Sequence, residues 1–99
     1  MEQSNSKYKY AGRISKFNTM NITLKYFGLL ADITNLKEEQ LTFDEETILV
    51  SDIKSKIELE YPRFQNTTYS IAVNQTISGF QTAIKNQDEI AFLPPFAGG

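Results

Sequence analysis

The sequence of 99 residues contains no cysteine and no histidine, and these two absences exclude most enzyme chemistry. Without cysteine there is no disulfide, no thiolate nucleophile and no cysteine-ligated zinc or iron–sulfur site. Without histidine, the side chain that most often serves as general base or metal ligand is missing as well. We therefore expect a chain that is not an enzyme by itself and that holds no metal ion. Any chemistry has to come from other groups, including the chain ends.

Long apolar runs are missing too. No stretch approaches the roughly 18 to 20 apolar residues that a membrane-spanning helix needs, and the N-terminus lacks the apolar core of a signal peptide. The sequence thus predicts a cytoplasmic protein without membrane association. With 40% hydrophobic and 22% charged residues, the composition is that of one ordinary globular domain.

The charge is unevenly distributed along the chain. Residues 1–19 carry four basic side chains and one acidic one, a net charge of +3, whereas residues 20–99 carry six basic and eleven acidic ones, a net charge of −5. The first segment shows no sustained period of two or of 3.6 residues, so we expect 1–19 to be a flexible N-terminal tail and 20–99 to be the folded domain. The interleaved lysines and tyrosines of residues 7–10 are more typical of a solvated tail than of a nucleic-acid contact, and we expect no nucleic-acid partner.

From Met20 onward the spacing of apolar residues predicts strands and one main helix. Ile22, Leu24 and Tyr26 alternate with polar residues, as in a strand with one buried face. Ser51, followed by an aspartate, is a suitable N-cap for a helix that ends before Pro62. The complete pattern predicts strands at 20–26, 39–43, 69–73, 76–80 and 89–93, a short helical turn at 29–34 and the helix just described. One principal helix among five strands indicates an α+β fold, a mixed sheet packed on one main helix.

Two apolar residues at strand ends break the alternation. Phe27 ends the polar face of the first strand, and Leu93 lies opposite the inward-facing Ile90 and Phe92 of the last strand. Both are predicted to point away from the core. Exposed apolar groups of this kind either form a binding patch or are isolated surface hydrophobes, and the pattern alone leaves both interpretations open.

The last six residues have the composition of a projecting arm. Pro94 and Pro95 cannot donate to a sheet ladder and hold the backbone near polyproline geometry, so the last strand has to stop there. Phe96 is a large apolar side chain on that arm, costly to expose unless a partner covers it. Ala97 leads to Gly98 and Gly99, which lack a Cβ and can thread a narrow channel to place the terminal carboxylate against a reagent.

Three stretches of the sequence resemble the small subunits of molybdopterin synthase. These are Leu-Lys-Tyr-Phe-Gly at 24–28, Ile-Ala-Val-Asn-Gln-Thr at 71–76, and Asp-Glu-Ile-Ala-Phe-Leu-Pro-Pro-Phe-Ala-Gly-Gly at 88–99. The resemblance covers about residues 20–99, and the diproline followed by the terminal Gly-Gly is its most specific part. It implies a β-grasp, ubiquitin-like fold.

The resemblance also implies a function for the arm. An ATP-dependent adenylating enzyme would activate the Gly99 carboxylate, and sulfur transfer would convert it to a thiocarboxylate. The large subunit of the synthase would take the arm, Pro94 to Gly99, into its active site, where the sulfur goes to a pterin precursor to form the dithiolene of molybdopterin. The resemblance thus implies a sulfur carrier within a hetero-oligomer that binds no cofactor itself. By position, Phe27, Ile77 and Leu93 match the family's apolar contact surface for the large subunit.

One position departs from the family pattern, and three other functions stay open. Gln87 stands where the family usually has glycine; because a left-handed conformation would strain it, we expect Asn86 to adopt that conformation instead. A carrier for thiamine synthesis or tRNA thiolation would use the same terminal chemistry. A ubiquitin-like modifier would instead join Gly99 to lysines of other proteins. A small binding module with an incidental glycine tail is the remaining alternative.

Overall fold

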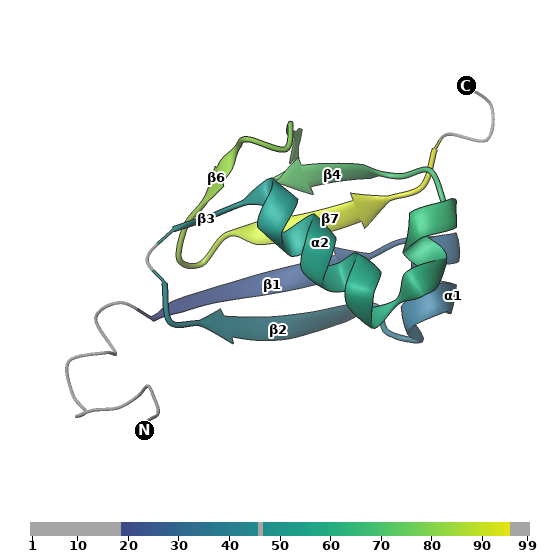
Figure 1. Ribbon diagram of the computed structural model, residues 1–99, viewed down its shortest axis with the longest axis horizontal. Coiled ribbons are helices and arrows are strands. Elements are labelled where there is room, and N and C mark those ends of the chain that lie inside the picture. The colour runs from purple at the N-terminus through teal and green to yellow at the C-terminus, as the bar shows by residue number, and fades with distance from the viewer. Residues whose placement is uncertain (1–18, 46, 96–99) are drawn as a thin grey trace.

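A five-stranded mixed sheet forms the centre of the fold in the computed structural model, which describes residues 19–45 and 47–95 (Figure 1). The strand order is β2-β1-β7-β4-β5, and β1 and β7 are parallel while the other pairs are antiparallel. The strands are β1 (Met20–Tyr26), β2 (Glu38–Phe43), β4 (Ser70–Val73), β5 (Thr76–Ile77) and β7 (Glu89–Leu93). Helix α2 (Val50–Glu60) crosses one face of this sheet (Figure 1). The α+β prediction of a mixed sheet on one main helix, the β-grasp arrangement, is confirmed.

Four smaller elements complete the described part of the chain. They are α1 (Leu29–Thr34), the 3-10 helix η3 (Pro62–Asn66), and the short strands β3 (Ile48–Leu49) and β6 (Ala83–Ile84), which pair as a second sheet. The sequence predicts α1 with its correct bounds but not η3, β3 or β6. The strand predicted at 76–80 ends earlier, at Ile77. Across the two described ranges, no helix is long and apolar enough to cross a membrane.

The core lies between the sheet and α2, and an aromatic cluster fills one end of it. Phe64, which η3 supplies, is fully buried at the centre of the cluster. Its ring centroid lies 5.4 Å from that of Tyr69, 5.9 Å from that of Phe92 and 6.3 Å from that of Tyr26. Edge-to-face pairs of this kind stabilise a core beyond the area that they bury. The inward residues of β1, namely Ile22, Leu24 and Tyr26, are all buried, as their alternation predicts.

Helix α2 begins two residues earlier than predicted, and its N-terminus is capped from another part of the chain. Val50 is its first helical residue, so the predicted N-cap Ser51 is wrong. The backbone N–H groups of Val50 and Ser51 donate to the carbonyls of Thr82 (2.9 Å) and Phe80 (3.0 Å). The carboxylate of Asp52 accepts from the backbone N–H of Leu49 at 2.8 Å. Carbonyls of the loop after β5 therefore satisfy the amides that a side-chain cap usually serves.

Two tight turns use residues with positive φ that are not glycine. Before β7, Gln87 itself adopts φ 73°, so the prediction that Asn86 takes the left-handed position is wrong. The Asn86 side-chain oxygen instead accepts from the backbone N–H of Asn21 at 2.7 Å, and Gln87 N–H donates to the Asn21 carbonyl at 2.7 Å. Before β5, Asn74 and Gln75 adopt φ 50° and 73°. Both turns carry backbone strain that glycine would not have.

Candidate functional site at the base of the C-terminal arm

The C-terminal arm leaves the sheet at the end of β7, beside the end of β1, with which β7 pairs in parallel. Phe92 pairs with Tyr26, and the Phe27 N–H donates to the Phe92 carbonyl at 3.2 Å, one step beyond β1. Pro94 and Pro95 then follow Leu93 outside the sheet, since proline has no N–H for the ladder. Pro94 is half-buried and Pro95 is exposed. The rest of the arm, Phe96, Ala97, Gly98 and Gly99, lies outside the described residues.

Gly28 packs against Pro94 at the base of the arm, and we call this contact the seat of the arm. Its φ of 56° with ψ of −132° belongs to a region that residues with a side chain rarely adopt. A Cβ at this position would lie 3.0 Å from Cγ of Pro94, closer than carbon atoms normally approach. The Gly28 carbonyl also accepts from the N–H of Ala31 at 3.0 Å, at the start of α1. Sequence reasoning missed this contact; the sequence signals were the glycine that ends the stretch 24–28 and the diproline at 94–95.

The sheet face opposite α2, the outer face, carries two of the three predicted contact residues. Cross-strand partners share a face, and the pairing runs Lys25, Ala91, Ala72, Ile77 across four strands. Leu93 is two residues from Ala91 on the same face. Two alanines therefore lie between Leu93 and Ile77 on this face, and of these Ala72 is buried and Ala91 is partly exposed.

Exposure differs among the three predicted contact residues. Ile77 is 62% exposed and Phe27, directly after the buried Tyr26, is 44% exposed. Leu93 is only partly exposed, so the alternation predicts its face correctly but overstates its exposure. Phe27 and Leu93 flank the base of the arm, whereas Ile77 lies two strands away from Leu93 on the edge strand β5.

The part of the outer face nearer β2 is polar. Lys25 Nζ lies 2.8 Å from a carboxylate oxygen of Glu89, and both side chains remain about one-third exposed, at 37% and 32%. The hydrogen bond and charge of Glu89 raise the pKa of Lys25 above its ordinary value. The outer face is thus apolar toward the arm and β5, and charged toward β2.

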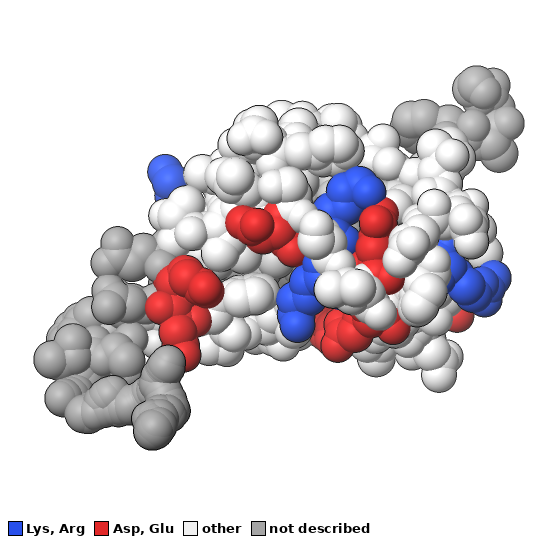
Figure 2. Space-filling model, in the orientation of Figure 1, with Lys and Arg blue, Asp and Glu red and all other residues white. Residues whose placement is uncertain are grey.

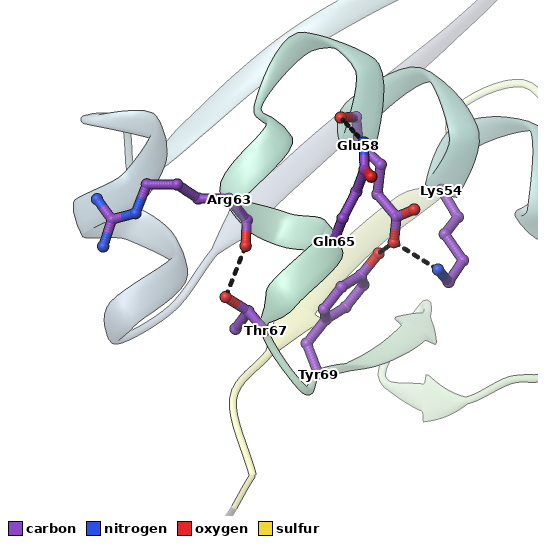
Figure 3. A network of polar contacts seen from close by, with 6 residues as sticks. All are labelled: Lys54, Glu58, Arg63, Gln65, Thr67 and Tyr69. Carbon is purple, nitrogen blue, oxygen red and sulfur yellow. Dashed lines mark hydrogen bonds and ion pairs between the residues drawn. The ribbon is translucent and has the colours of Figure 1, made fainter.

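On the opposite side of the molecule, the contacts of the charged side chains stabilise the fold. Basic and acidic side chains are interspersed over α2 and η3, with no large patch of one sign (Figure 2). Glu58 on α2 accepts from the Tyr69 hydroxyl at 2.6 Å and pairs with Lys54 (Figure 3). The bond from Lys54, and then that from Tyr69, lower the pKa of Glu58, while burial and then Glu58 raise the pKa of Tyr69. These contacts attach the chain directly before β4 to α2. Among the described residues, no cluster of three acidic side chains is arranged to hold a metal ion.

Comparison with known proteins places the arm and its base inside one family. The model of the ThiS family matches residues 24–99, which include the Gly28 seat, the outer face and the whole arm. The chain belongs to the ThiS family. Among curated members, a molybdopterin synthase sulfur carrier subunit of Mycobacterium tuberculosis is 26% identical over 82 residues, 81% of this chain and 99% of that protein. A second such subunit, from Haemophilus influenzae, is 55% identical over 29 residues, which span 29% of this chain but only 36% of that protein.

Solved structures of similar proteins share the fold of this ThiS-family chain. A putative molybdopterin converting factor subunit 1 from Pyrococcus furiosus has a TM-score of 0.70 at 21% identity, covering 78% of this chain and 99% of that one. SAMP1 from Haloferax volcanii has a TM-score of 0.66 at 19% identity, covering 80% and 99%. Subunit 1 in a complex of the two molybdopterin-converting factor subunits of Helicobacter pylori has a TM-score of 0.55 at 23% identity, covering 81% and 100%. At these identities the likeness shows the fold alone.

Proposed function

We propose that this protein is a sulfur carrier for molybdopterin synthesis, and that Gly99 carries the sulfur as a thiocarboxylate. The main support for the proposal is that the ThiS family model matches this chain through its last residue. In addition, Gly28 packs against Pro94 at the base of the arm. Two curated members that this chain resembles are sulfur carrier subunits of molybdopterin synthase. The absence of cysteine fits, because the transferable sulfur would be carried on the terminal carboxylate.

The chemistry would proceed at Gly99 in two activating steps. A carboxylate oxygen attacks the α-phosphorus of ATP in an adenylating partner, forming an acyl-adenylate and releasing pyrophosphate. A persulfide of a sulfur-donor protein then attacks the acyl carbon and AMP leaves, and a second thiol of the donor cleaves the resulting acyl disulfide, which releases the thiocarboxylate and leaves a disulfide on the donor. ATP belongs to the partner, and this chain supplies the reacting terminus without binding a cofactor. Gly98 lets the backbone enter a narrow active site because it has no Cβ to obstruct it.

The outer face is the proposed docking surface for the large synthase subunit. Gly-Gly alone provides little binding energy, so an arm held inside another protein needs apolar anchors near its base. Phe27 and Leu93 lie there, and Ile77 lies on the edge strand β5, with Ala72 and Ala91 between it and Leu93. The Helicobacter pylori structure, which holds subunits 1 and 2 together, supports a hetero-oligomer of this kind.

Intact-mass analysis of the protein co-expressed with its adenylating enzyme tests the proposal. The expected result is exchange of one carboxylate oxygen for sulfur at Gly99, lost when Gly99 is deleted. An unmodified terminus in cells that make active molybdopterin synthase from this chain would refute it. Restoration of molybdopterin synthesis, as opposed to thiamine synthesis or tRNA thiolation, in the matching deletion strains would identify the pathway.

A ubiquitin-like modifier is the second candidate, because the fold also matches the archaeal modifier SAMP1. A modifier would join Gly99 to lysine amines of other proteins through an isopeptide bond. Immunoblotting of cell extracts against this chain separates the two functions. A ladder of larger conjugates that disappears on deletion of Gly99 would favour the modifier, whereas a single band carrying thiocarboxylate favours the carrier.

A further inference from the structure

The sheet edge at β5 is partly open. Strand β5 has two residues and pairs only with the last two residues of β4, and no described residue pairs with the first half of β4 on that side (Figure 1). One more hydrogen bond follows, from the Ser78 N–H to the Ile71 carbonyl at 2.9 Å, before the chain turns toward the N-terminus of α2. Strand β2, at the other edge, carries Glu38 and Glu39, and charged side chains of this kind discourage pairing with another strand.

Backbone groups at the open edge lack hydrogen-bond partners. In an antiparallel sheet, both backbone groups of a residue point to the same side of its strand. The Ile71 carbonyl points toward β5 to meet Ser78, so the Ile71 N–H points to this edge as well. Within residues 19–45 and 47–95, no atom accepts from the Ile71 N–H, and none bonds to either backbone group of Tyr69. Ile71 is only 3% exposed, and a covered N–H without an acceptor costs free energy that a carbonyl of another chain would recover.

A hollow of about 250 Å³ lies at this edge. Its lining comes from β4, β5, α2 and the loop after β5: Lys54, Tyr69, Ser70, Ile71, Ile77, Ser78, Gly79 and Phe80. Ser70 and Ile77 belong to the outer face of the sheet, whereas Ile71 is buried in the core on the side of α2. Because both faces contribute, the hollow follows the edge itself. A strand laid along it would direct alternate side chains to the two faces.

The side chains around the hollow favour an uncharged, apolar occupant. Among the described residues that line it, only Lys54 is charged, and its Nζ forms an ion pair with Glu58 (Figure 3). The same Nζ lies 5.4 Å from the ring centroid of Tyr69 and 5.6 Å from that of Phe80. The charge of Lys54 is therefore compensated. Phe80, 55% exposed, and Ile77, 62% exposed, are the apolar groups that an occupant would cover.

We propose that this edge binds an extended apolar segment of another protein as an added strand. A carbonyl of the segment accepts from the Ile71 N–H, and an N–H of the segment donates to the Tyr69 carbonyl. One side chain of the segment packs on Phe80, and the next packs on Ile77. Since Ser78 closes one end, the paired part is about three residues long, roughly 10 Å. Ile77 also belongs to the proposed docking surface, so the edge site continues that surface around β5, and in this respect it rests on the proposed function.

Amide hydrogen exchange in the full-length chain, measured by NMR, tests the pairing directly. In the free chain, the Ile71 amide should exchange at least about tenfold faster than the Ala72 amide, because the Ala72 N–H points the other way, into the ladder with β7. The probe is the peptide acetyl-Gly-Ser-Val-Ile-Val-Ser-Gly amide at millimolar concentration. Its binding should slow the Ile71 exchange at least about tenfold and leave that of Ala72 unchanged. The same peptide, N-methylated at its three central residues, keeps the side chains but loses the donors, and should bind at least about tenfold more weakly.

A pair of matched substitutions tests the side-chain contacts. Phe80→Ala should weaken binding of the peptide by about fivefold or more. Leu59→Ala removes a leucine that is 79% exposed on α2 and outside the hollow, and it should have no effect.

Three results would overturn the proposal: no binding of the peptide, equal affinity for its N-methylated form, or unchanged Ile71 exchange in the complex. Slow Ile71 exchange in the free chain that is lost on dilution would also overturn it, because the edge would then pair with a second copy of this chain. Thiocarboxylate formation is scored separately by intact mass, so failure of the edge site would leave the carrier function standing.

Discussion

Replacing Gly28 with alanine is the most direct test of how the fold holds the arm. Alanine at φ 56° and ψ −132° is strained, at a cost of about 1–3 kcal/mol. Its Cβ would also lie 3.0 Å from Pro94 Cγ, whereas carbon atoms pack best at roughly 3.5–4.0 Å. Pro94 therefore has to move by about half an ångström or more. We expect Gly28→Ala to lower the unfolding free energy by about 2–4 kcal/mol in total.

A double-mutant cycle separates the contact from the backbone strain. Pro94→Ala removes Cγ, so Gly28→Ala should be less destabilising in that background by about 0.5–1.5 kcal/mol. Urea unfolding followed by circular dichroism measures all four variants. Gly79→Ala is the control, because a Cβ there meets no atom within 4 Å. If Gly28→Ala is as stable as the wild type, or if the cycle shows no coupling, the seat described here does not exist.

Further changes to the sequence test the turns, the terminus and the docking face. Gln87→Gly should raise the unfolding free energy by about 0.5–1 kcal/mol in urea titrations, because φ 73° strains glutamine; an unchanged midpoint would contradict this. Deletion of Gly99, or Gly98→Val, should abolish thiocarboxylate formation by intact mass while the melting temperature stays within about 2 °C, since glycine has no side chain to bury; normal activity without Gly99 would eliminate the carrier function. Phe27→Asp should weaken binding to the large subunit at least about tenfold by calorimetry with little loss of stability, whereas Leu93→Asp should reduce both because Leu93 is half-buried. Unfolding of the free Phe27→Asp chain would place Phe27 in the core.

The regular parts of the fold follow from local sequence patterns. Alternation over Met20–Tyr26 identifies β1 and its buried face, and the run Glu89–Leu93 has the bounds of β7. Both strands are long enough for a period of two to be clear. Leu93 shows the limit of that reasoning, because alternation gives its face but not how far neighbouring groups cover it.

Features that depend on contacts between residues far apart in the chain cannot be predicted from local sequence patterns. The cap of α2 comes from carbonyls of Phe80 and Thr82, about thirty residues away, so Ser51 is a false local signal. Strands of two residues, such as β3 and β6, are too short to show any period. Nothing local to Gly28 reveals that Pro94 lies against it, and this contact is what defines the arm base.

The central position of β7 bears on the order in which the fold can form. Thr23 pairs with Glu89, so the first and last strands of the described domain meet across 66 residues in the middle of the sheet. Such non-local pairing is slow to form and cannot begin until the final strand exists. A nascent chain that stops before β7 lacks the strand joining β1 to β4 and cannot close its core. The core and the contact of Pro94 with Gly28 are therefore completed in the same step of folding.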